Sequence, residues 1–186
     1  MIRVALIGAG GMAGFHVRKF RAVSECEVVA VCDIRAERVS EFAEEYGIRE
    51  VYTDTDELFA KSRFDAVAIV TPDPTHRPLA LQALAEGKHI LCEKPLGLDH
   101  AQTVEMRDAA EKADRINMVH FTYRNTPAIQ KTCELVGRGE LGTIRHVHAN
   151  YLQSWLVHDY WGDWRKSPNW LWRLSKAHGS GGRGNA

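Results

Sequence analysis

Residues 4–16 read VALIGAGGMAGFH, an apolar run followed by a glycine-rich turn and the start of an amphipathic stretch. This order predicts a buried strand that ends at Ile7, then a tight turn, then a helix. Gly8 permits the tight turn, and Gly10 carries no side chain that would block a pyrophosphate. The free N–H groups at the start of the next helix bind phosphate. The stretch therefore predicts a dinucleotide-binding turn with Ala13, an accepted variant, at its third motif position.

The composition limits the classes of partner. The chain has 186 residues, 45% hydrophobic and 26% charged, which suffices for one full domain and part of a second. Lys plus Arg and Asp plus Glu both number 24, and such a balance favours neither nucleic acid nor an anionic membrane as partner. Met1 leads directly into the first predicted strand and no apolar run approaches a membrane span, so we expect a cytoplasmic protein.

The four cysteines, Cys26, Cys32, Cys92 and Cys133, are widely separated and form no CxxC pair. Three of them lie in or beside apolar stretches, which is typical of small buried side chains. The sequence therefore predicts buried, reduced thiols.

Strands and helices alternate along most of the chain. From their apolar runs, the strands after the first are predicted at residues 27–32, near 51, 66–70, 89–92 and 116–119. Because these strands read as fully buried and are separated by helices, they predict a parallel sheet in the order 3-2-1-4-5-6. The predicted fold class is therefore α/β, a Rossmann doubly wound parallel sheet over residues 1–122.

Spacing and capping residues place the helices between those strands. Phe15, Phe20 and Val23 are expected to form the apolar face of the first helix. Gly47 follows the second helix where a left-handed residue would end it, and Asp99 stands where it would cap a long helix.

The region that follows is predicted to begin a second domain. Residues 127–136 have helical spacing, and residues 143–153 read as a strand with His146 and His148 on one face. We therefore expect residues 123–186 to begin a second domain, which the family resemblance given below implies to be an incomplete α+β substrate or dimerisation domain. No third ligand stands at a supporting distance from the two histidines, so we interpret them as strand residues and predict no metal site.

Polar residues follow four of the predicted strands. They are the glycine-rich turn, Asp33, the stretch Thr71–His76 (TPDPTH) and the stretch Glu93–Pro95 (EKP). Ligands bind beyond the carboxyl ends of the strands in open parallel sheets, so these residues should converge. Asp33 lies about 20 residues after the turn, where an acid accepts hydrogen bonds from an adenosine ribose. The alternative for Asp33 is an aspartate that caps a helix or a turn.

Asp33 favours NAD over NADP as the cofactor, because its carboxylate would repel a ribose 2′-phosphate. Arg35 keeps the alternative open, since a guanidinium two residues later can pair with that phosphate. The expected cofactor is therefore NAD, with NADP possible.

The family of the chain is indicated by three stretches: IGAGGMAGFH at residues 7–16, FDAVAIVTPDPTHRPLALQALAEGKHILCEKPLGLD at residues 64–99, and the YR pair at 123–124. They resemble the glucose-fructose oxidoreductase, inositol dehydrogenase and MocA family. This resemblance implies an NAD(P)-dependent oxidoreductase that transfers a hydride between a nicotinamide cofactor and a carbinol of a sugar- or polyol-like substrate. It also implies that the full-length form is a homo-oligomer.

By the same resemblance, Lys94 lies at the nicotinamide and the substrate, where it takes part in proton transfer or orients the reacting hydroxyl. The chemistry agrees, because oxidising a carbinol moves a hydride to the nicotinamide while the hydroxyl proton must leave, and a positioned lysine can exchange that proton. The resemblance also places Glu93 and His76 at the nicotinamide ribose. The expected cofactor-binding residues are Gly8, Gly10, Gly11, Met12, Ala13, Asp33, Arg35, Thr71, Pro72, His76, Glu93, Lys94, Arg124, Trp172 and Arg173.

All five tryptophans of the chain fall within residues 155–172: Trp155, Trp161, Trp164, Trp170 and Trp172. Aromatic faces stack on the C–H surfaces of sugars, which favours a carbohydrate or polyol pocket. A tryptophan cluster is equally typical of a core or a subunit interface. The two interpretations stay open.

The resemblance departs at the C-terminus. Family members are considerably longer and continue into a segment whose aspartate and histidine complete the catalytic site, whereas this chain ends in RGNA, and Asp159, Asp163 and His178 do not occupy the matching positions. We therefore expect a truncated member. The alternatives are a catalytically impaired NAD(P)-binding module and a methyltransferase, which also uses a glycine-rich turn with an acid after the second strand but lacks the EKP and TPDPTH stretches.

Overall fold

The computed structural model describes residues 1–152, 154, 158, 163 and 166. The chain divides into two compact units, Met1–His120 and Phe121–Ala186, and each is described by itself.

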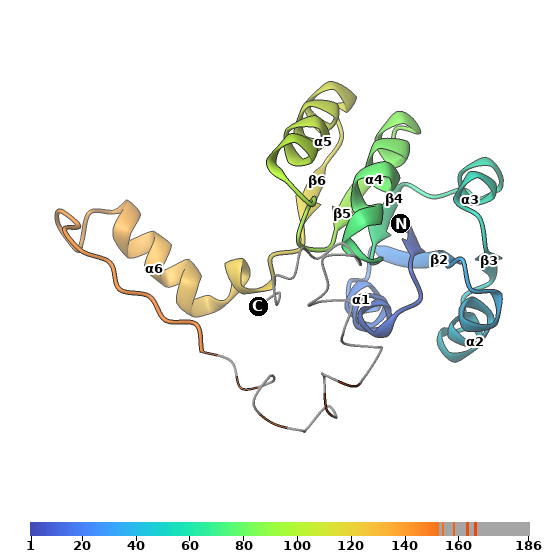
Figure 1. Ribbon diagram of the computed structural model, residues 1–186, viewed down its shortest axis with the longest axis horizontal. Helices are drawn as coiled ribbons and strands as arrows, with labels where there is room; N and C mark the ends of the chain where they lie inside the picture. Colours follow the sequence, from blue (N-terminus) through green and yellow to red (C-terminus); the bar gives the residue numbers. More distant parts are fainter. Residues whose placement is uncertain (153, 155–157, 159–162, 164–165, 167–186) are drawn as a thin grey trace. The chain divides into compact units, whose positions relative to one another are not determined.

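The first unit is built on one parallel sheet of six strands (Figure 1). The strands are β1 (Ile2–Ile7), β2 (Cys26–Cys32), β3 (Glu50–Tyr52), β4 (Ala66–Ile69), β5 (His89–Cys92) and β6 (Asn117–Val119). Their order, β3-β2-β1-β4-β5-β6, confirms the predicted order and the Rossmann fold class.

The register of the sheet aligns the carboxyl ends of the strands, so this edge of the sheet is level. Ile7 of β1 lies opposite both Cys32 of β2 and Ile69 of β4, and the alignment continues from Ile69 to Cys92 of β5 and from Cys92 to Val119 of β6. Each strand ends at or next to these residues. The residues that follow the strands therefore emerge side by side along the carboxyl edge, as the sequence predicted for the functional residues.

Helices connect the strands. They are α1 (Gly11–Arg21), α2 (Ala36–Tyr46), α3 (Thr55–Lys61), α4 (His76–Ala85) and α5 (His100–Ala113), with a short 3-10 helix η1 (Asp73–Thr75) before α4. The predicted caps are confirmed: Gly47 ends α2 at φ +57°, and the Asp99 carboxylate accepts a hydrogen bond from the Gln102 N–H at the start of α5.

The helices cover both faces of the sheet, and each face has its own core. Because side chains alternate along a strand, Leu6 of β1 points into one core while Ala5 and Ile7 point into the other. The Leu6 core is completed by α1 and α2, and the opposite core by α3, α4 and α5 (Figure 1). Leu58 of α3 is fully buried in the second core.

The buried face of α1 differs from the prediction. Ala13 and Val17 are fully buried against the sheet and Phe20 packs beside them, whereas Val23 lies beyond the end of the helix and is exposed. Small side chains at the contact let α1 approach the sheet closely, so the larger aromatic residues occupy its margin. The predicted face of Phe15, Phe20 and Val23 is therefore confirmed for Phe20 and wrong for Val23.

The second unit contains the 3-10 helix η2 (Thr122–Asn125) and the helix α6 (Pro127–Gly137), which confirms the predicted helix. The predicted strand at 143–153 is wrong over its described part: residues 143–152 form neither strand nor helix. Their backbone pairs with no strand among the described residues, and a strand requires such a partner. His146 and His148 are exposed there and face no sheet.

The cysteine prediction holds in part. All four thiols are free, with Cys32 and Cys92 buried, but Cys26 is half-buried and Cys133 on α6 is exposed. Burial raises the pKa of the Cys32 and Cys92 thiols to about 12, which keeps both protonated and unreactive. Among the helices that the structure describes, none has the length and apolarity needed to cross a membrane.

Candidate functional site

The glycine-rich turn joins the ends of β1, β2 and β4. Gly8 adopts φ +105°, and its N–H donates to the Cys32 carbonyl at 2.7 Å. A Cβ atom at Gly8 would overlap the carbonyl oxygen of Val70, which directly follows β4. Both the backbone angle and the close approach therefore require glycine at this position.

The turn leaves the start of α1 open. Gly10 is the N-cap residue and supplies no side-chain hydrogen bond to the helix, and the first turn of α1 holds no acidic residue. Gly11 has no atom within 4 Å of where its Cβ would stand, Met12 is exposed, and Ala13 is fully buried beneath them. The unpaired N–H groups and the positive end of α1 thus have no competing negative group of their own helix.

Asp33 ties this turn to the end of β2. Its Oδ2 accepts a hydrogen bond from the Ala9 N–H at 2.9 Å, and its Oδ1 accepts one from the Arg35 N–H at 3.0 Å. The Arg35 guanidinium lies 3.7 Å from the same Oδ1. Asp33 therefore forms the turn contact that the sequence left as an alternative, and also holds the glycine-rich turn with its other oxygen.

Arg38 is a site residue that the sequence analysis did not identify. Its Nε donates to the Ala9 carbonyl at 2.9 Å, so Ala9 is fixed at its N–H by Asp33 and at its carbonyl by Arg38. Arg38 follows Arg35 by three residues on α2, and residues at that spacing share one helix face. That spacing was the available signal.

His76 connects two loops at the opposite side of the edge. It begins α4 and is completely buried. Its Nδ1 lies 2.7 Å from the Pro95 carbonyl oxygen, and its Nε2 lies 2.9 Å from the Thr71 carbonyl oxygen. The ring thus joins the loop after β4, which contains Thr71 and Pro72, to the loop after β5.

Glu93 directly follows β5 and is the centre of a buried polar cluster. Its Oε1 lies 2.8 Å from His16 Nε2 and 2.8 Å from His120 Nδ1, and its Oε2 accepts a hydrogen bond from the Lys94 N–H at 3.2 Å. Burial raises the pKa of the Glu93 carboxyl, but the hydrogen bonds from His16 and His120 outweigh it and lower that pKa to about 2. The carboxylate is therefore held charged inside the protein.

Lys94 lies between Glu93 and Pro95, both of which are hydrogen-bonded to histidine side chains. Its side chain is half-buried, and within the described residues its ammonium forms no hydrogen bond or ion pair. The bond between Lys94 and Pro95 is cis. An amine without a protein partner at the carboxyl edge is available to a ligand.

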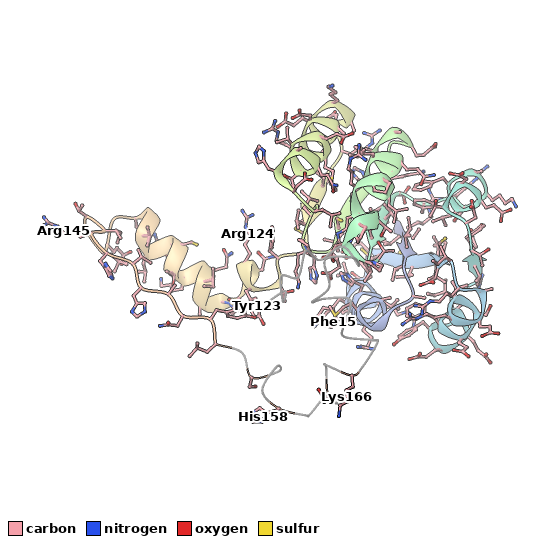
Figure 2. All side chains as sticks on the ribbon, viewed as in Figure 1. Phe15, Tyr123, Arg124, Arg145, His158 and Lys166 are labelled. Atoms are coloured by element: carbon pink, nitrogen blue, oxygen red, sulfur yellow. The ribbon has the colours of Figure 1, made fainter. Side chains whose placement is uncertain are left out.

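The described structure brings together the glycine-rich turn, Asp33 and Arg35 at one part of this edge, and Thr71, Pro72, His76, Glu93 and Lys94 at another. Arg124 lies in the second unit, on η2, and Figure 2 labels its side chain there. Trp172 and Arg173, like the other four tryptophans, lie outside the described residues.

One group of side chains has the composition of a metal site. The ligand atoms of His16, Glu93 and His120 all lie within 4.8 Å of one another. Two histidines and a carboxylate are a donor set that Zn²⁺ accepts. The hydrogen bonds within the cluster already satisfy these atoms, and the absence of a metal site stays a prediction.

The sequence analysis missed His16 and His120. His120 immediately follows β6, so the rule that pointed to the residues after four other strands also applies to it. His16 gave no such signal, because a histidine inside a helix can face any side and only the structure shows that it is 3% exposed.

The comparisons with known proteins assign the chain to a family. The oxidoreductase family with an NAD-binding Rossmann fold, Gfo/Idh/MocA, matches residues 2–121. The chain belongs to that family. Within the Gfo/Idh/MocA family, it is 35% identical over 153 residues to D-glucoside 3-dehydrogenase of Escherichia coli, covering 82% of this chain and 44% of the relative. It is 37% identical over 155 residues to inositol 2-dehydrogenase of Rubrobacter xylanophilus, covering 80% and 44%.

A solved structure of a Gfo/Idh/MocA-like fold is that of an oxidoreductase from Agrobacterium radiobacter in complex with NAD⁺, L-tartaric acid and magnesium. It superposes with a TM-score of 0.72 at 30% identity, over 76% of this chain and 42% of that one. The chain thus spans less than half the length of these relatives. The family assignment favours the predicted oxidoreductase over the methyltransferase alternative.

Proposed function

We propose that the chain carries the cofactor-binding half of an NAD-dependent dehydrogenase that oxidises a hydroxyl group of a sugar- or polyol-like substrate. The observation that carries this proposal is the level carboxyl edge, along which the glycine-rich turn, Asp33 and Lys94 follow strands β1, β2 and β5. The names of the two curated relatives, a glucoside dehydrogenase and an inositol dehydrogenase, support the substrate class.

The residues of the turn fit a dinucleotide. Gly10 and Gly11 present no side chain where a pyrophosphate approaches the start of α1, and no acidic group of that first turn would repel it. The Asp33 carboxylate, next to the turn, is the group that would accept hydrogen bonds from the adenosine ribose. When bound, NAD supplies the acceptor for the hydride.

Lys94 is the proposed proton-exchanging residue. Its half-buried amine has no partner among the described residues, so it can hydrogen-bond the hydroxyl of a bound substrate. As the hydride leaves the carbinol carbon, the hydroxyl oxygen loses its proton, and a neutral Lys94 amine at hydrogen-bond distance accepts it. In the reverse direction the ammonium returns that proton to the carbonyl oxygen.

We also propose NAD over NADP as the preferred cofactor. The Asp33 carboxylate occupies the side of the turn where a 2′-phosphate would have to lie, and repels it. Arg35 and Arg38 flank the same region with positive charge, but Arg35 lies beside Asp33 and Arg38 is bound to the Ala9 carbonyl, which reduces what they offer a phosphate.

A second candidate is a binding module that holds NAD with little or no turnover. The chain spans 44% of each of these curated relatives, whose further residues can take part in catalysis. Titration with NADH and NADPH, followed by turnover assays on inositol and glucosides, separates the candidates. NADH binding with turnover supports the dehydrogenase, and binding without turnover supports the module. Binding of neither nucleotide overturns the cofactor assignment.

The remaining sequence-based expectations are proposals of the same kind. A cytoplasmic location is supported by the four free thiols, since reduced cysteines are typical of that compartment. The 1–122 domain boundary rests on the predicted strands and helices, and a homo-oligomeric full-length form rests on the family resemblance. Size-exclusion chromatography with light scattering measures the oligomeric state directly.

A further inference from the structure

In the stretch Glu93–Pro95, the two outer residues are hydrogen-bonded to other side chains, whereas the side chain of the middle residue is not. Glu93 is bound through its carboxylate, and Pro95 through its carbonyl oxygen, whereas the Lys94 ammonium has no partner among the described residues. A long flexible side chain can be directed to a substrate only if its own backbone is fixed. Lys94 has neighbours on both sides that meet this requirement.

Among the described residues, the side chains that hold these neighbours are histidines from three different parts of the fold. His16 lies on α1, His76 begins α4, and His120 follows β6. His16 and His76 are 3% and 0% exposed. Burying an imidazole costs free energy unless its nitrogens are hydrogen-bonded, so two buried rings aimed at the neighbours of one lysine are not explained by core packing alone.

We propose that His16, His76 and His120 are positioning residues that fix the backbone on either side of Lys94 and so hold its amine at the reaction centre. The inference rests on the proposed function, in which Lys94 exchanges the substrate proton. His76 fixes Pro95 and links it to Thr71, while His16 and His120 both contact Oε1 of Glu93. A misplacement of about 1 Å at a reacting group can lower a rate about 100-fold, so such rigidity has kinetic consequences.

Each histidine forms its contact through one particular ring nitrogen. The proposal can therefore be tested by comparing Asn and Gln as replacements at each position. His76 and His120 contact their partners through Nδ1, the position that the amide of Asn reproduces, whereas His16 contacts Glu93 through Nε2, the position that the amide of Gln reproduces. We therefore expect His76→Asn, His120→Asn and His16→Gln to retain the contact. We expect His76→Gln, His120→Gln and His16→Asn to lose it.

The primary measurement is the acetylation rate of each lysine by trace acetic anhydride, read by mass spectrometry on the 186-residue chain. In the variants that lose the contact, the Lys94 rate should rise about threefold or more as its backbone loosens, while exposed Lys61 and Lys112 keep their rates. In the variants that retain the contact, the Lys94 rate should match that of the unchanged protein. If the histidines only fill space, the same replacement, Asn or Gln, should give the lower Lys94 acetylation rate at all three positions. That outcome overturns the proposal.

Two controls separate the proposed effect from a general disturbance of β5 and from a failure to fold. His89 lies at the other end of β5, and its Nδ1 accepts a hydrogen bond from the Ile116 N–H at 3.0 Å, so His89→Ala disturbs the same strand without touching Glu93 or Pro95. A Lys94 rate that rises as much in His89→Ala as in His76→Gln contradicts the inference. If the His76 variants fail to fold, the His120 pair decides, because that side chain is partly exposed.

Nucleotide binding and metal binding are measured on the same samples. Failure of the unchanged protein to bind NADH overturns the proposed function, whereas the acetylation pattern still decides whether the histidines hold Lys94. Titration with Co²⁺ tests the alternative use of the His16, Glu93 and His120 cluster. A tetrahedral Co²⁺ absorption spectrum that is lost in His16→Gln would show that these side chains bind a metal ion instead of one another. That result would overturn the assignment.

Discussion

The glycine-rich end of the candidate site (Gly8–Ala13 with Asp33) and its lysine end (Glu93–Pro95 with His76) are constructed in different ways. At the glycine-rich end, the backbone angle of Gly8 (φ +105°) sets the turn, and the side chains of Asp33 and Arg38 hold Ala9 at its N–H and its carbonyl. At the lysine end, the shape comes from buried side chains that reach in from distant elements. A local sequence motif marks the first end, whereas the contacts of the second end are visible only in the structure.

The largest effect that separates the two ends is expected for Lys94→Ala. Removing a general acid or base typically lowers a rate about 10²–10⁴-fold, so turnover should fall by at least that much while NADH affinity changes less than about twofold. Steady-state kinetics and fluorescence titration measure the two quantities. Lys61→Ala, on the exposed surface of α3, is the control. An unchanged turnover number would exclude Lys94 from proton exchange.

Gly8→Val should produce the next largest effect, on stability rather than on chemistry. The new side chain would be strained at φ +105° and would overlap the Val70 carbonyl, which together should cost about 3 kcal/mol of unfolding free energy. Urea denaturation followed by circular dichroism measures it. Gly11→Ala is the matched control, because nothing stands within 4 Å of its new methyl group. Equal stability of the two variants would contradict the close approach at Gly8.

Asp33→Ala should weaken NADH binding about 10- to 100-fold, since it removes both the ribose partner and the bond that holds the Ala9 N–H. The affinity for NADPH should fall less, because the repulsion of a 2′-phosphate is removed at the same time. Fluorescence titrations with both nucleotides give the ratio. The exposed acid Glu37, on the first turn of α2, serves as the control in Glu37→Ala. A parallel loss for both nucleotides would argue against selection by Asp33.

Glu93→Gln should produce the smallest change, and one that depends on pH. Because the folded-state pKa of the Glu93 carboxyl is lowered to about 2, its charge stabilises the fold above its ordinary pKa of 4.5, and that stability is lost as the pH falls towards 2. The unchanged protein should therefore be more stable than the variant at pH 7, by about 1–3 kcal/mol. Urea unfolding at several pH values tests this. A difference that stays constant from pH 7 to pH 2 would rule out the charge as its source.

Sequence alone predicted the parts of the fold that local physics determines. The left-handed Gly47 and the cap at Asp99 are confirmed because each depends on a short stretch of chain. The strand order is confirmed because alternating buried strands and helices favour one doubly wound topology. The strand at 143–153 failed because a strand needs a partner that its own residues do not specify. The face of α1 is confirmed only for Phe20, because Ala13 and Val17, rather than larger residues, meet the sheet.

The same distinction applies to the site. Residues that follow a strand could be placed in advance, and Asp33, Glu93 and Lys94 do lie at the carboxyl edge. His120 was within reach of that rule and was missed. His16 and the bridging role of His76 were not predictable, because each depends on a contact between elements that are far apart in the chain.

The double attachment of Ala9 has a consequence for the order of folding. Its N–H is bound by Asp33, which follows β2, and its carbonyl by Arg38 of α2. The first strand, turn and helix therefore contain the whole glycine motif but lack the side chains that hold Ala9. The turn acquires its conformation only when the second βα unit docks. Completion of the glycine-rich turn therefore depends on non-local contacts, and nucleotide affinity during refolding would report the docking of α2.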